Sequence, residues 1–244
     1  MKSILSISLV VLLLASCQKS DNDLTAPSLA GIPKIKTFFI SDTKGIINSV
    51  AIEYDAVGRF SKGVYKDGHC IKYTYTPGKV TIESFTAANV SDNKGTYVLN
   101  GDGLVIKYYN NAYPAFVTHF TYTAGKKILT EINENNDDTT YQLYHTYNAA
   151  GNLIADSIIN GSITTKRKVE YYTDKISTIE NPNSGVNFYG IPNTNCPKQS
   201  SVKLSSSNYI HTDFNIPETD AKGRIIKSVY SSQGETYTAL YTYY

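Results

Sequence analysis

Apolar and polar residues alternate with a period of two along most of the chain. In residues 71–76 the side chains of Ile71, Tyr73 and Tyr75 fall on one face of an extended strand, and residues 141–147 follow the same rule. Turn-forming residues separate these runs, and no stretch of ten or more residues has helical periodicity. The pattern therefore predicts an all-β fold of short antiparallel strands.

A turn motif recurs four times and organises these strands. Each copy has Asp or Asn, two intervening residues, a glycine and then an apolar strand. The Asp or Asn side chain can accept a hydrogen bond from the backbone N–H two residues on, and the glycine can adopt the positive φ that closes a hairpin. The copies are IEYDAVGRFSKGVY, YVLNGDGLVIKYY, HTYNAAGNLIADSII and PETDAKGRIIKSVY, with turn glycines Gly58, Gly103, Gly151 and Gly223.

The repeated units predict a single β-repeat domain over residues 34–244. We expect an antiparallel meander of about 14–18 strands that forms one long curved sheet, with hairpins at the repeats. A single layer suits a sheet with one wet, Tyr-rich face, while a closed barrel and a two-sheet sandwich also fit the pattern. A segment rich in Pro, Asn and Ser predicts a loop insertion at about residues 182–207.

The N-terminus has the features of a secretory signal. Lys2 precedes an apolar run at residues 4–14 that is too short to cross a bilayer, so residues 1–16 are predicted to be a signal peptide. The sequence Leu-Ala-Ser-Cys resembles the lipobox of bacterial lipoproteins, which implies that Cys17 carries a lipid. Residues 17–33 are polar and predict a flexible tether. We therefore expect a lipid-anchored outer-membrane protein that faces the cell surface or the periplasm.

Charge and cysteine content narrow the classes of partner. The chain has 23 Lys and Arg against 21 Asp and Glu, and these residues are interspersed without a basic face. Nucleic acid is therefore not an expected partner. Apart from Cys17, the cysteines are Cys70 and Cys196, which outside the cytoplasm form either a disulfide or two buried thiols. Neither has the CxxC spacing of a redox or zinc site.

No sequence motif predicts a metal site, a cofactor or a catalytic centre. The histidines lack metal-ligand spacing and are expected on strand faces. An acidic run lacks the calcium-loop pattern and is expected at a solvated hairpin tip. No nucleophile elbow, phosphate loop or dinucleotide fingerprint is present, although paired glycosidase carboxylates leave no sequential signature. The residues concerned are His69, His119, His145 and His211, and Glu131, Glu134, Asp137 and Asp138.

Tyrosine is frequent, with 21 residues, whereas tryptophan is absent. A Tyr ring packs while its hydroxyl reaches water, so Tyr suits a half-wet sheet face. Packing within the sheet and stacking on an extended ligand both remain open, and the lack of Trp counts against a glycan. The candidate aromatic binding face comprises Tyr73, Tyr75, Tyr108, Tyr122, Tyr147, Tyr171 and Tyr243.

The repeated turn resembles the YD repeats of shell-forming polymorphic toxins. The late insertion and the lipobox make the chain more similar to uncharacterised Bacteroidetes-type outer-membrane lipoproteins with degenerate YD-like hairpins. This resemblance covers about residues 35–244, implies a mostly antiparallel β protein on the outer membrane, and names no activity. The matching residues are Tyr54, Asp55, Gly58, Arg59, Phe60, Gly68, Tyr73 and Tyr75, then Asn148, Gly151, Asn152 and Leu153, and finally Asp220, Gly223, Arg224 and Ile225.

We expect a monomeric, non-catalytic β scaffold or binding module, with a glycan or an outer-membrane protein as partner. The alternatives are a carrier of an apolar ligand on a curved sheet and, less favoured, a glycan-acting enzyme. An open wet sheet favours the scaffold, an apolar concavity the carrier, and a deep pocket with converging carboxylates the enzyme. A membrane-spanning barrel is disfavoured because Lys72, Glu83, Lys107 and Glu170 interrupt any lipid-facing apolar band.

Overall fold

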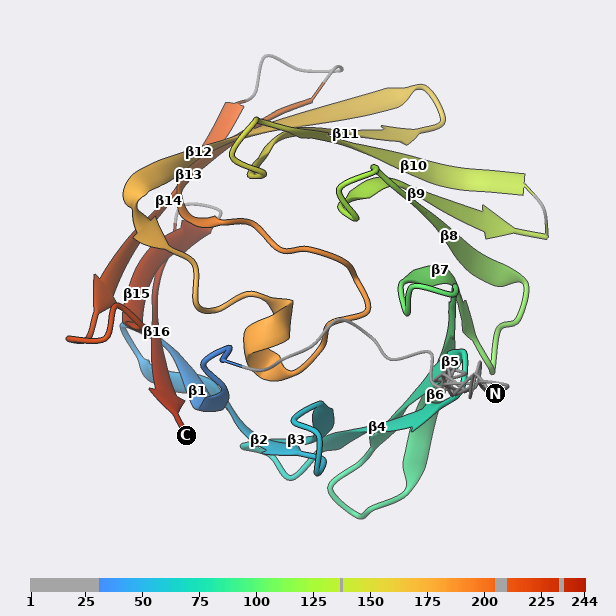
Figure 1. Cartoon of the computed structure of the whole chain (residues 1–244), viewed down its shortest axis with the longest axis horizontal. Helices are drawn as coiled ribbons and strands as arrows, with labels where there is room; N and C mark the ends of the chain where they lie inside the picture. Colours follow the sequence, from blue (N-terminus) through green and yellow to red (C-terminus); the bar gives the residue numbers. More distant parts are fainter. Residues whose placement is uncertain (1–30, 137, 205–209, 233–234) are drawn as a thin grey trace, which may run out of the picture.

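Strands make up most of the structure. The computed structural model describes residues 31–136, 138–204, 210–232 and 235–244. Within these ranges the chain forms sixteen strands and one short 3-10 helix, labelled as in Figure 1. The elements are β1 (Ile35–Asp42), β2 (Gly45–Tyr54), β3 (Phe60–Tyr65), β4 (Cys70–Thr76), β5 (Lys79–Phe85), β6 (Ser91–Leu99), β7 (Val105–Asn110), β8 (Phe116–Tyr122), β9 (Ile128–Asn135), β10 (Asp138–Tyr147), β11 (Leu153–Asn160), β12 (Ile163–Ile176), η1 (Asn181–Ser184), β13 (Asn195–Leu204), β14 (Ile210–Thr219), β15 (Ile225–Ser232) and β16 (Glu235–Tyr243).

The sheet closes on itself to form a barrel. Each strand pairs antiparallel with the next in sequence, and β1 also pairs with β16, placing Phe38 opposite Tyr241. Figure 1 shows the resulting ring. The predictions of an all-β fold, an antiparallel meander and 14–18 strands are confirmed, and the predicted long curved sheet is a closed barrel. Closure pairs the N–H and C=O groups that two edge strands would leave exposed.

The interior of the barrel holds the hydrophobic core. Val80, Val105 and Phe188 are fully buried there, with 0% of each residue exposed. Around them pack half-buried tyrosines such as Tyr73 and Tyr75, which share the inward face of β4. The apolar positions of the period-two pattern are therefore the inner wall.

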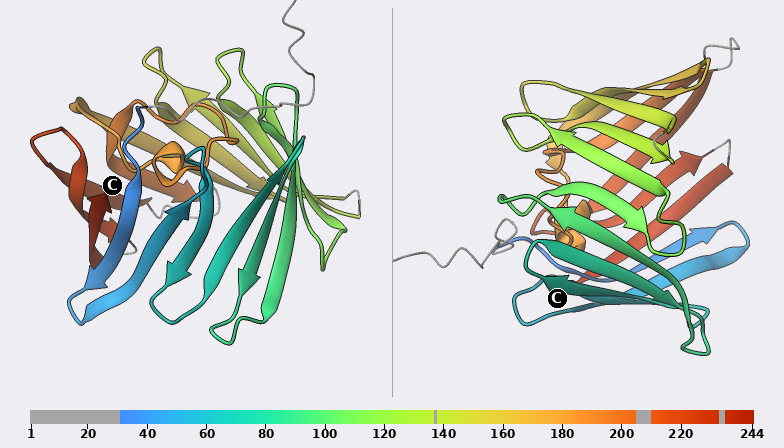
Figure 2. Two further views of the ribbon diagram at one scale, coloured as in Figure 1. Left: turned by 60° about the horizontal axis from the view of Figure 1, so that its bottom comes forward. Right: turned by 90° about the vertical axis from the view of Figure 1, so that its right-hand side faces the viewer.

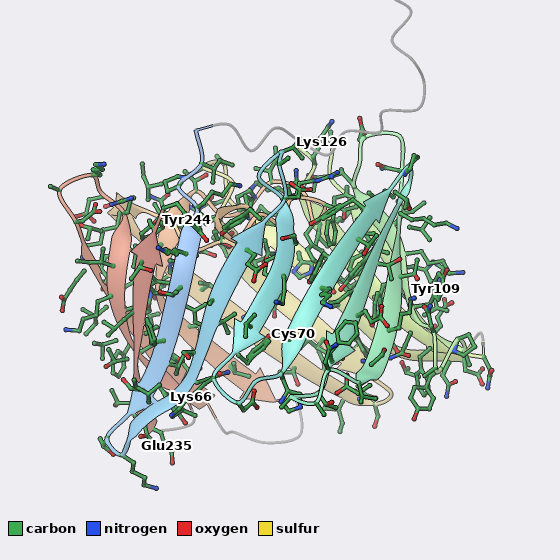
Figure 3. The ribbon with its side chains drawn as sticks, turned by 90° about the horizontal axis from the view of Figure 1, so that it is seen from below. Lys66, Cys70, Tyr109, Lys126, Glu235 and Tyr244 are labelled. Atoms are coloured by element: carbon green, nitrogen blue, oxygen red, sulfur yellow. The ribbon has the colours of Figure 1, made fainter. Side chains whose placement is uncertain are left out.

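The outer wall carries charged side chains instead. Lys72 of β4 lies opposite Glu83 of β5, which lies opposite Lys94 of β6, and Lys94 Nζ is 3.9 Å from Glu83 Oε2. Glu170 of β12 is likewise exposed. Polar side chains project from the wall in Figure 3, where Tyr109 also points outward. Membrane-spanning barrels present a continuous apolar band to lipid, and charged positions such as Lys72 and Glu83 interrupt the exposed side chains of this wall, which also include Phe214, Ile216 and Leu240. No helix in the described ranges is long and apolar enough to span a membrane.

Residues 177–194, between β12 and β13, turn into the barrel and lie across its interior (Figures 1 and 2). We call this segment the plug. It contains η1, and its Phe188 ring lies 4.9 Å from the Tyr97 ring and 4.8 Å from the Tyr189 ring, measured between centroids. The loop insertion was expected over about 182–207, but the chain re-enters a strand at Asn195. The Pro and Asn residues correctly predicted an irregular backbone for this segment. They could not predict that the plug is buried, because that depends on the barrel around it.

The pairing register shifts by one residue at the five hairpins that contact the plug, and each of them carries a β-bulge. Four of them contain the predicted turn glycines Gly58, Gly103, Gly151 and Gly223, whose φ angles are +81°, +75°, +80° and +76°. The fifth hairpin joins β8 to β9 and lacks the Asp/Asn-x-x-Gly motif, and its positive-φ residue is Lys126 at +58°. A bulge leaves backbone groups next to the turn without ladder partners.

Candidate functional site

The plug satisfies the N–H groups that the bulges leave unpaired. In each of four hairpins the first apolar strand residue donates its backbone N–H to the plug. This first apolar residue after each turn thus packs its side chain in the core and donates its backbone N–H to the plug. The four bonds are Phe60 N to Gly185 O (3.1 Å), Val105 N to Phe188 O (2.8 Å), Leu153 N to Asn193 Oδ1 (2.8 Å) and Ile225 N to Thr178 Oγ1 (2.8 Å).

Tyrosine hydroxyls bond to the carbonyl of the same residue in three of these hairpins, and to that of Ile128 in the hairpin between β8 and β9. Each donor lies 15–19 residues after its acceptor, on the next strand along the chain. Burial raises the pKa of the Tyr147 hydroxyl to about 12, so this group remains a protonated donor at neutral pH. The four bonds are Tyr75 to Phe60 O (3.0 Å), Tyr147 to Ile128 O (2.8 Å), Tyr171 to Leu153 O (2.9 Å) and Tyr243 to Ile225 O (2.8 Å).

Asp and Arg complete the motif. Asp55 Oδ1 accepts the backbone N–H groups of Val57 (3.1 Å) and Arg59 (2.8 Å), and its Oδ2 accepts Arg59 Nε at 2.7 Å. The Arg59 guanidinium lies 4.1 Å from the Tyr75 ring centroid, a cation–π contact. Burial alone would raise the pKa of Asp55, but these hydrogen bonds and the positive charge hold it below its usual value. The residues that resemble a YD repeat therefore build the hairpin and join it to the next one.

The face of each of the seven candidate tyrosines was left open by the sequence, and in the structure they lie inside the barrel. Tyr73 packs at 4.7 Å from the Phe60 ring, and Tyr108 at 4.7 Å from the Tyr97 ring. Tyr122 is half-buried and its hydroxyl lies 3.5 Å from Phe188 O. A wet outer Tyr face is therefore not the arrangement in the structure. A ligand that contacts these rings has to enter the interior.

A track of polar side chains crosses the inner wall on four neighbouring strands. Glu131, His145, Asp156 and Arg167 come from β9, β10, β11 and β12, and register places His145 opposite Asp156 and Asp156 opposite Arg167. His145 Nε2 lies 3.1 Å from Glu131 Oε1, and Arg167 Nε donates to Asp156 Oδ2 at 2.8 Å. The His145 side chain is 8% exposed, and its Nδ1 has no hydrogen-bond partner in the described part of the chain.

His145 also lines a cavity of about 240 Å³ between the plug and the wall, which we call the polar cavity. Tyr147 and Leu153 belong to its wall side, and Glu180 and Tyr189 to its plug side. Burial raises the pKa of Glu180, against hydrogen bonds from Ser177 and Asn193 and the nearby positive charge of Lys127. The cavity thus combines a carboxyl group, an imidazole and two aromatic rings.

A second cavity, of about 250 Å³, lies between the plug and the wall formed by β1, β2, β15 and β16. Its lining is largely aliphatic and aromatic and includes Ile40, Ile52, Ile179 and Tyr241. We call it the apolar cavity. It has the chemistry of a site for a hydrophobic group.

The remaining candidate residues are dispersed. Cys70 and Cys196 are buried free thiols, so the possible disulfide is not formed. They lie on β4 and β13, seven strands apart around the ring by the shorter path, whereas a disulfide needs Cα atoms within about 7 Å. Burial raises the pKa of the Cys196 thiol to about 11, which keeps it unreactive. Within the described ranges no cluster of three His, Cys, Asp or Glu side chains has the geometry of a metal site. Cys17 lies outside the described residues.

Only part of the acidic run lies at the predicted hairpin tip: Asp138 is exposed beside the turn, and Asp137 lies outside the described residues. β9 extends to Asn135, so Glu131 and Glu134 lie on the strand, with Glu131 inside and Glu134 outside beside His119 at 3.3 Å. Sequence reasoning also did not single out Asp156 or Glu180. Alternation alone gave no signal for Glu131, because the extra residue of the bulge, Leu129 on β9, shifts the inward positions of that strand by one. Without the bulge, its face cannot be assigned.

Comparison with known proteins establishes the fold and not a family. No protein-family model matches the chain, and no curated protein sequence does. A porin-like protein from Bacteroides uniformis is similar in structure, with a TM-score of 0.65 and 12% identity over 86% of this chain and 98% of that one. A porin-like protein from Bacteroides vulgatus has a TM-score of 0.54 and 10% identity over 87% of this chain and 99% of that one.

At these identities the likeness is one of barrel fold alone. The Tc holotoxin pore of Photorhabdus luminescens also matches, with a TM-score of 0.32 and 8% identity over 82% of this chain and 13% of that one, which is too weak to support an inference. Membership of a lipoprotein family with YD-like hairpins therefore stays a prediction.

Proposed function

We propose that this protein is a non-catalytic binding module of the bacterial cell envelope whose ligand surface is the inside of the barrel. The observation that carries the proposal is the inner wall, whose aromatic lining leaves two cavities beside the plug. Ligand sites are concave and mostly apolar with a few polar groups, and both cavities fit that description. The expected ligands are a glycan or a segment of an outer-membrane protein.

Anchoring through Cys17 would hold the protein at the cell envelope without requiring the barrel to span the bilayer. The lipobox-like sequence would attach the chain to the outer membrane, and a polar tether would hold a water-facing barrel beside the bilayer. The two porin-like neighbours come from Bacteroides, which is compatible with an envelope location. A charged outer wall also favours a monomer.

The anchor is tested by detergent partition. The wild-type protein expressed in a Bacteroidetes host is expected in the detergent phase, and Cys17→Ser in the aqueous phase or as an unprocessed precursor. Cys70→Ser is the matched control and is expected to partition like wild type. Recovery of the wild type wholly in the aqueous phase would remove the lipid anchor from the proposal. Protease shaving of intact cells then distinguishes the surface from the periplasm.

Ligand binding is tested by a glycan and outer-membrane-protein screen on the Cys17→Ser chain. We expect a binder whose affinity is lost when a lumen position is filled by Ile40→Trp or Leu153→Trp. The outer-wall substitution Lys72→Ala is expected to leave binding unchanged. A binder that is lost with Lys72→Ala and kept in both filling variants would move the ligand surface outside, and turnover of any glycan would replace the binding module with an enzyme.

A carrier of an apolar ligand is the second candidate, and the apolar cavity is the observation that favours it. A fluorescent fatty acid, such as a dansylated undecanoic acid, is the probe. The carrier role predicts an increase in its fluorescence with wild type, and its loss with Ile40→Trp but not with Leu153→Trp. Equal fluorescence for all three proteins would count against a carrier.

A further inference from the structure

An open groove of about 410 Å³ lies where the described chain begins, at the end of the barrel that the plug occupies. Residues 31–33 line it together with the last residue, Tyr244, whose backbone N–H donates to Lys34 O at 3.1 Å. The hairpin between β14 and β15 adds Lys222 and Arg224. We call this site the entry groove, because the chain enters the barrel beside it.

The charged side chains of the entry groove are basic. Lys34, Lys222 and Arg224 line it, and the Lys36 ammonium group lies 5.4 Å from the ring centroid of Tyr244. Lys36 and Lys222 are exposed. Two separate parts of the chain, the start of β1 and the β14–β15 hairpin, therefore bring four cationic side chains to one groove.

Two carboxylates oppose these four cations. Asp220 lies 2.7 Å from Arg224 Nη2, and the α-carboxylate of the last residue, Tyr244, adds a second negative charge. The charge of Asp55 also reaches the groove, but Asp55 is paired with Arg59 at 2.7 Å. An excess of two positive charges therefore remains at the groove.

The groove has unused hydrogen-bond donors. The Lys222 ammonium group has no hydrogen bond or ion pair with any described residue. Lys34 donates to Pro182 O at 3.2 Å and keeps two further N–H donors, and Arg224 directs only Nε and Nη2 at Asp220. An anionic group can therefore bind here without displacing an existing contact.

The position of the groove in the chain connects it with the membrane. Cys17, the proposed site of lipid attachment, lies fourteen residues before Gly31. A flexible chain of that length has a root-mean-square span of about 20 Å, so a lipid on Cys17 would hold the groove beside the headgroups. Because anchoring raises the effective concentration of the surface, a few charges suffice for docking.

The opposite end of the barrel differs in charge. Figure 3 shows Lys66 and Glu235 at that end. Exposed acids gather there, in or next to the hairpins, beside the lysines Lys44 and Lys66. An anionic surface would therefore attract the entry groove and not this end. The exposed acids include Asp67, Asp92, Asp138 and Glu235.

We propose that the entry groove docks on the anionic, phosphate-bearing headgroups of the membrane that anchors Cys17, so that the plug end faces the bilayer and the opposite end faces away from it. Lysine and arginine near a membrane surface are attracted to anionic lipids, and tyrosine is enriched at the level of the headgroups. Tyr244 is 66% exposed and available for such a contact. The inference rests on the proposed lipid anchor and adds the surface that orients the barrel.

Vesicle co-sedimentation tests the groove apart from the anchor. The probe is a vesicle of phosphatidylglycerol and phosphatidylcholine in equimolar mixture, compared with a vesicle of phosphatidylcholine alone. The protein is the mature chain with Cys17→Ser, which carries neither the signal peptide nor a lipid. We expect this parent chain to bind the anionic vesicles only, and to be released in molar sodium chloride, which screens the charges.

Two lysines in matched turns distinguish the two ends of the barrel. Lys222 and Lys44 are both exposed, and each donates its backbone N–H to the Asp two residues earlier, at 2.9 Å and 2.6 Å. Lys222→Ala is expected to weaken binding to the anionic vesicles about fivefold. Lys44→Ala is the control and is expected to bind like the parent chain. Neither ammonium group has a partner among the described residues, so both variants are expected to melt like the parent chain.

The outcomes separate the groove from the anchor. Equal sedimentation of the parent chain with both kinds of vesicle, or with neither, would overturn the groove as a surface for anionic lipid, and so would an equal effect of the two substitutions. Detergent partition of the wild-type protein judges the anchor independently. A protein that enters the detergent phase but ignores anionic vesicles has the anchor without the groove, and one that binds these vesicles but stays in the aqueous phase has the groove without the anchor.

Discussion

A tyrosine in this barrel stabilises the fold with both its ring and its hydroxyl group. The ring of Tyr171 fills interior volume, and its hydroxyl donates to Leu153 O at 2.9 Å, next to a bulge that leaves this carbonyl without a ladder partner. Phe would supply the same ring without the donor. Four of the five bulged hairpins receive such a donor from the next strand, so part of the tyrosine content follows from the hairpins.

Removal of one such hydroxyl is expected to destabilise the barrel. Tyr171→Phe leaves a half-buried carbonyl unsatisfied and is expected to lower the free energy of unfolding by about 1–2 kcal/mol. Tyr144→Phe is the matched control, because its hydroxyl is exposed and bonds to the nearby Gln142 side chain, and its effect is expected within about 0.5 kcal/mol. Urea titration of both variants measures the difference. Equal midpoints would show that the hydroxyl–carbonyl bonds contribute nothing net.

At the scale of elements, the hairpins and the plug depend on each other. The bulged hairpins expose N–H groups toward the barrel interior, and the plug has no regular structure of its own beyond η1. Gly185 and Gly190 allow its backbone to approach the hairpins closely, since a Cβ on Gly185 would lie 2.4 Å from Phe60 N and one on Gly190 would lie 2.2 Å from Lys126 O. The plug is therefore a part of the fold that the hairpins position.

Two glycines with similar φ separate the contribution of backbone conformation from that of packing. Gly223 has φ +76° with open space where the methyl group of an alanine would lie, so Gly223→Ala is expected to destabilise by about 1 kcal/mol. Gly190 has φ +92° and backbone at 2.2 Å, so Gly190→Ala is expected to cost about 3 kcal/mol or more. Chemical denaturation measures both. A Gly190→Ala protein as stable as Gly223→Ala would indicate that the plug is loosely held.

At the scale of the whole molecule, sixteen strands enclose more space than their own side chains fill, and the plug occupies part of it. Lys126 marks one end of the barrel, and Lys66 and Glu235 mark the other (Figure 3). The plug bonds to the hairpins at the end where Lys126 lies, including the bond from Ile191 N to Lys126 O at 3.0 Å. One end of the interior is thus filled by the chain itself.

Phe188 at the centre of the interior is expected to be essential for stability. It is 0% exposed and contacts the rings of Tyr97 and Tyr189, so Phe188→Ala is expected to destabilise by about 3–5 kcal/mol. The control Phe214→Ala removes a ring that is 40% exposed and is expected to cost about 1 kcal/mol or less. Thermal melts monitored by circular dichroism compare them. A Phe188→Ala melt close to wild type would mean that the barrel is stable without a packed plug.

The sequence by itself determined the strands, their antiparallel order and the hairpin chemistry, because period-two alternation and the Asp/Asn-x-x-Gly turns are local properties of the backbone. Asp55, Gly58 and Gly223 act where the motif predicted. Tertiary structure alone decided that β1 meets β16, that the Pro-rich insertion folds inward, and that Glu131 and His145 share the inner wall. Closure and burial depend on pairs of residues far apart in the chain, and each bulge reverses the face of every residue beyond it. A one-residue shift cannot be read from alternation, so the polar cavity became visible only in the folded barrel.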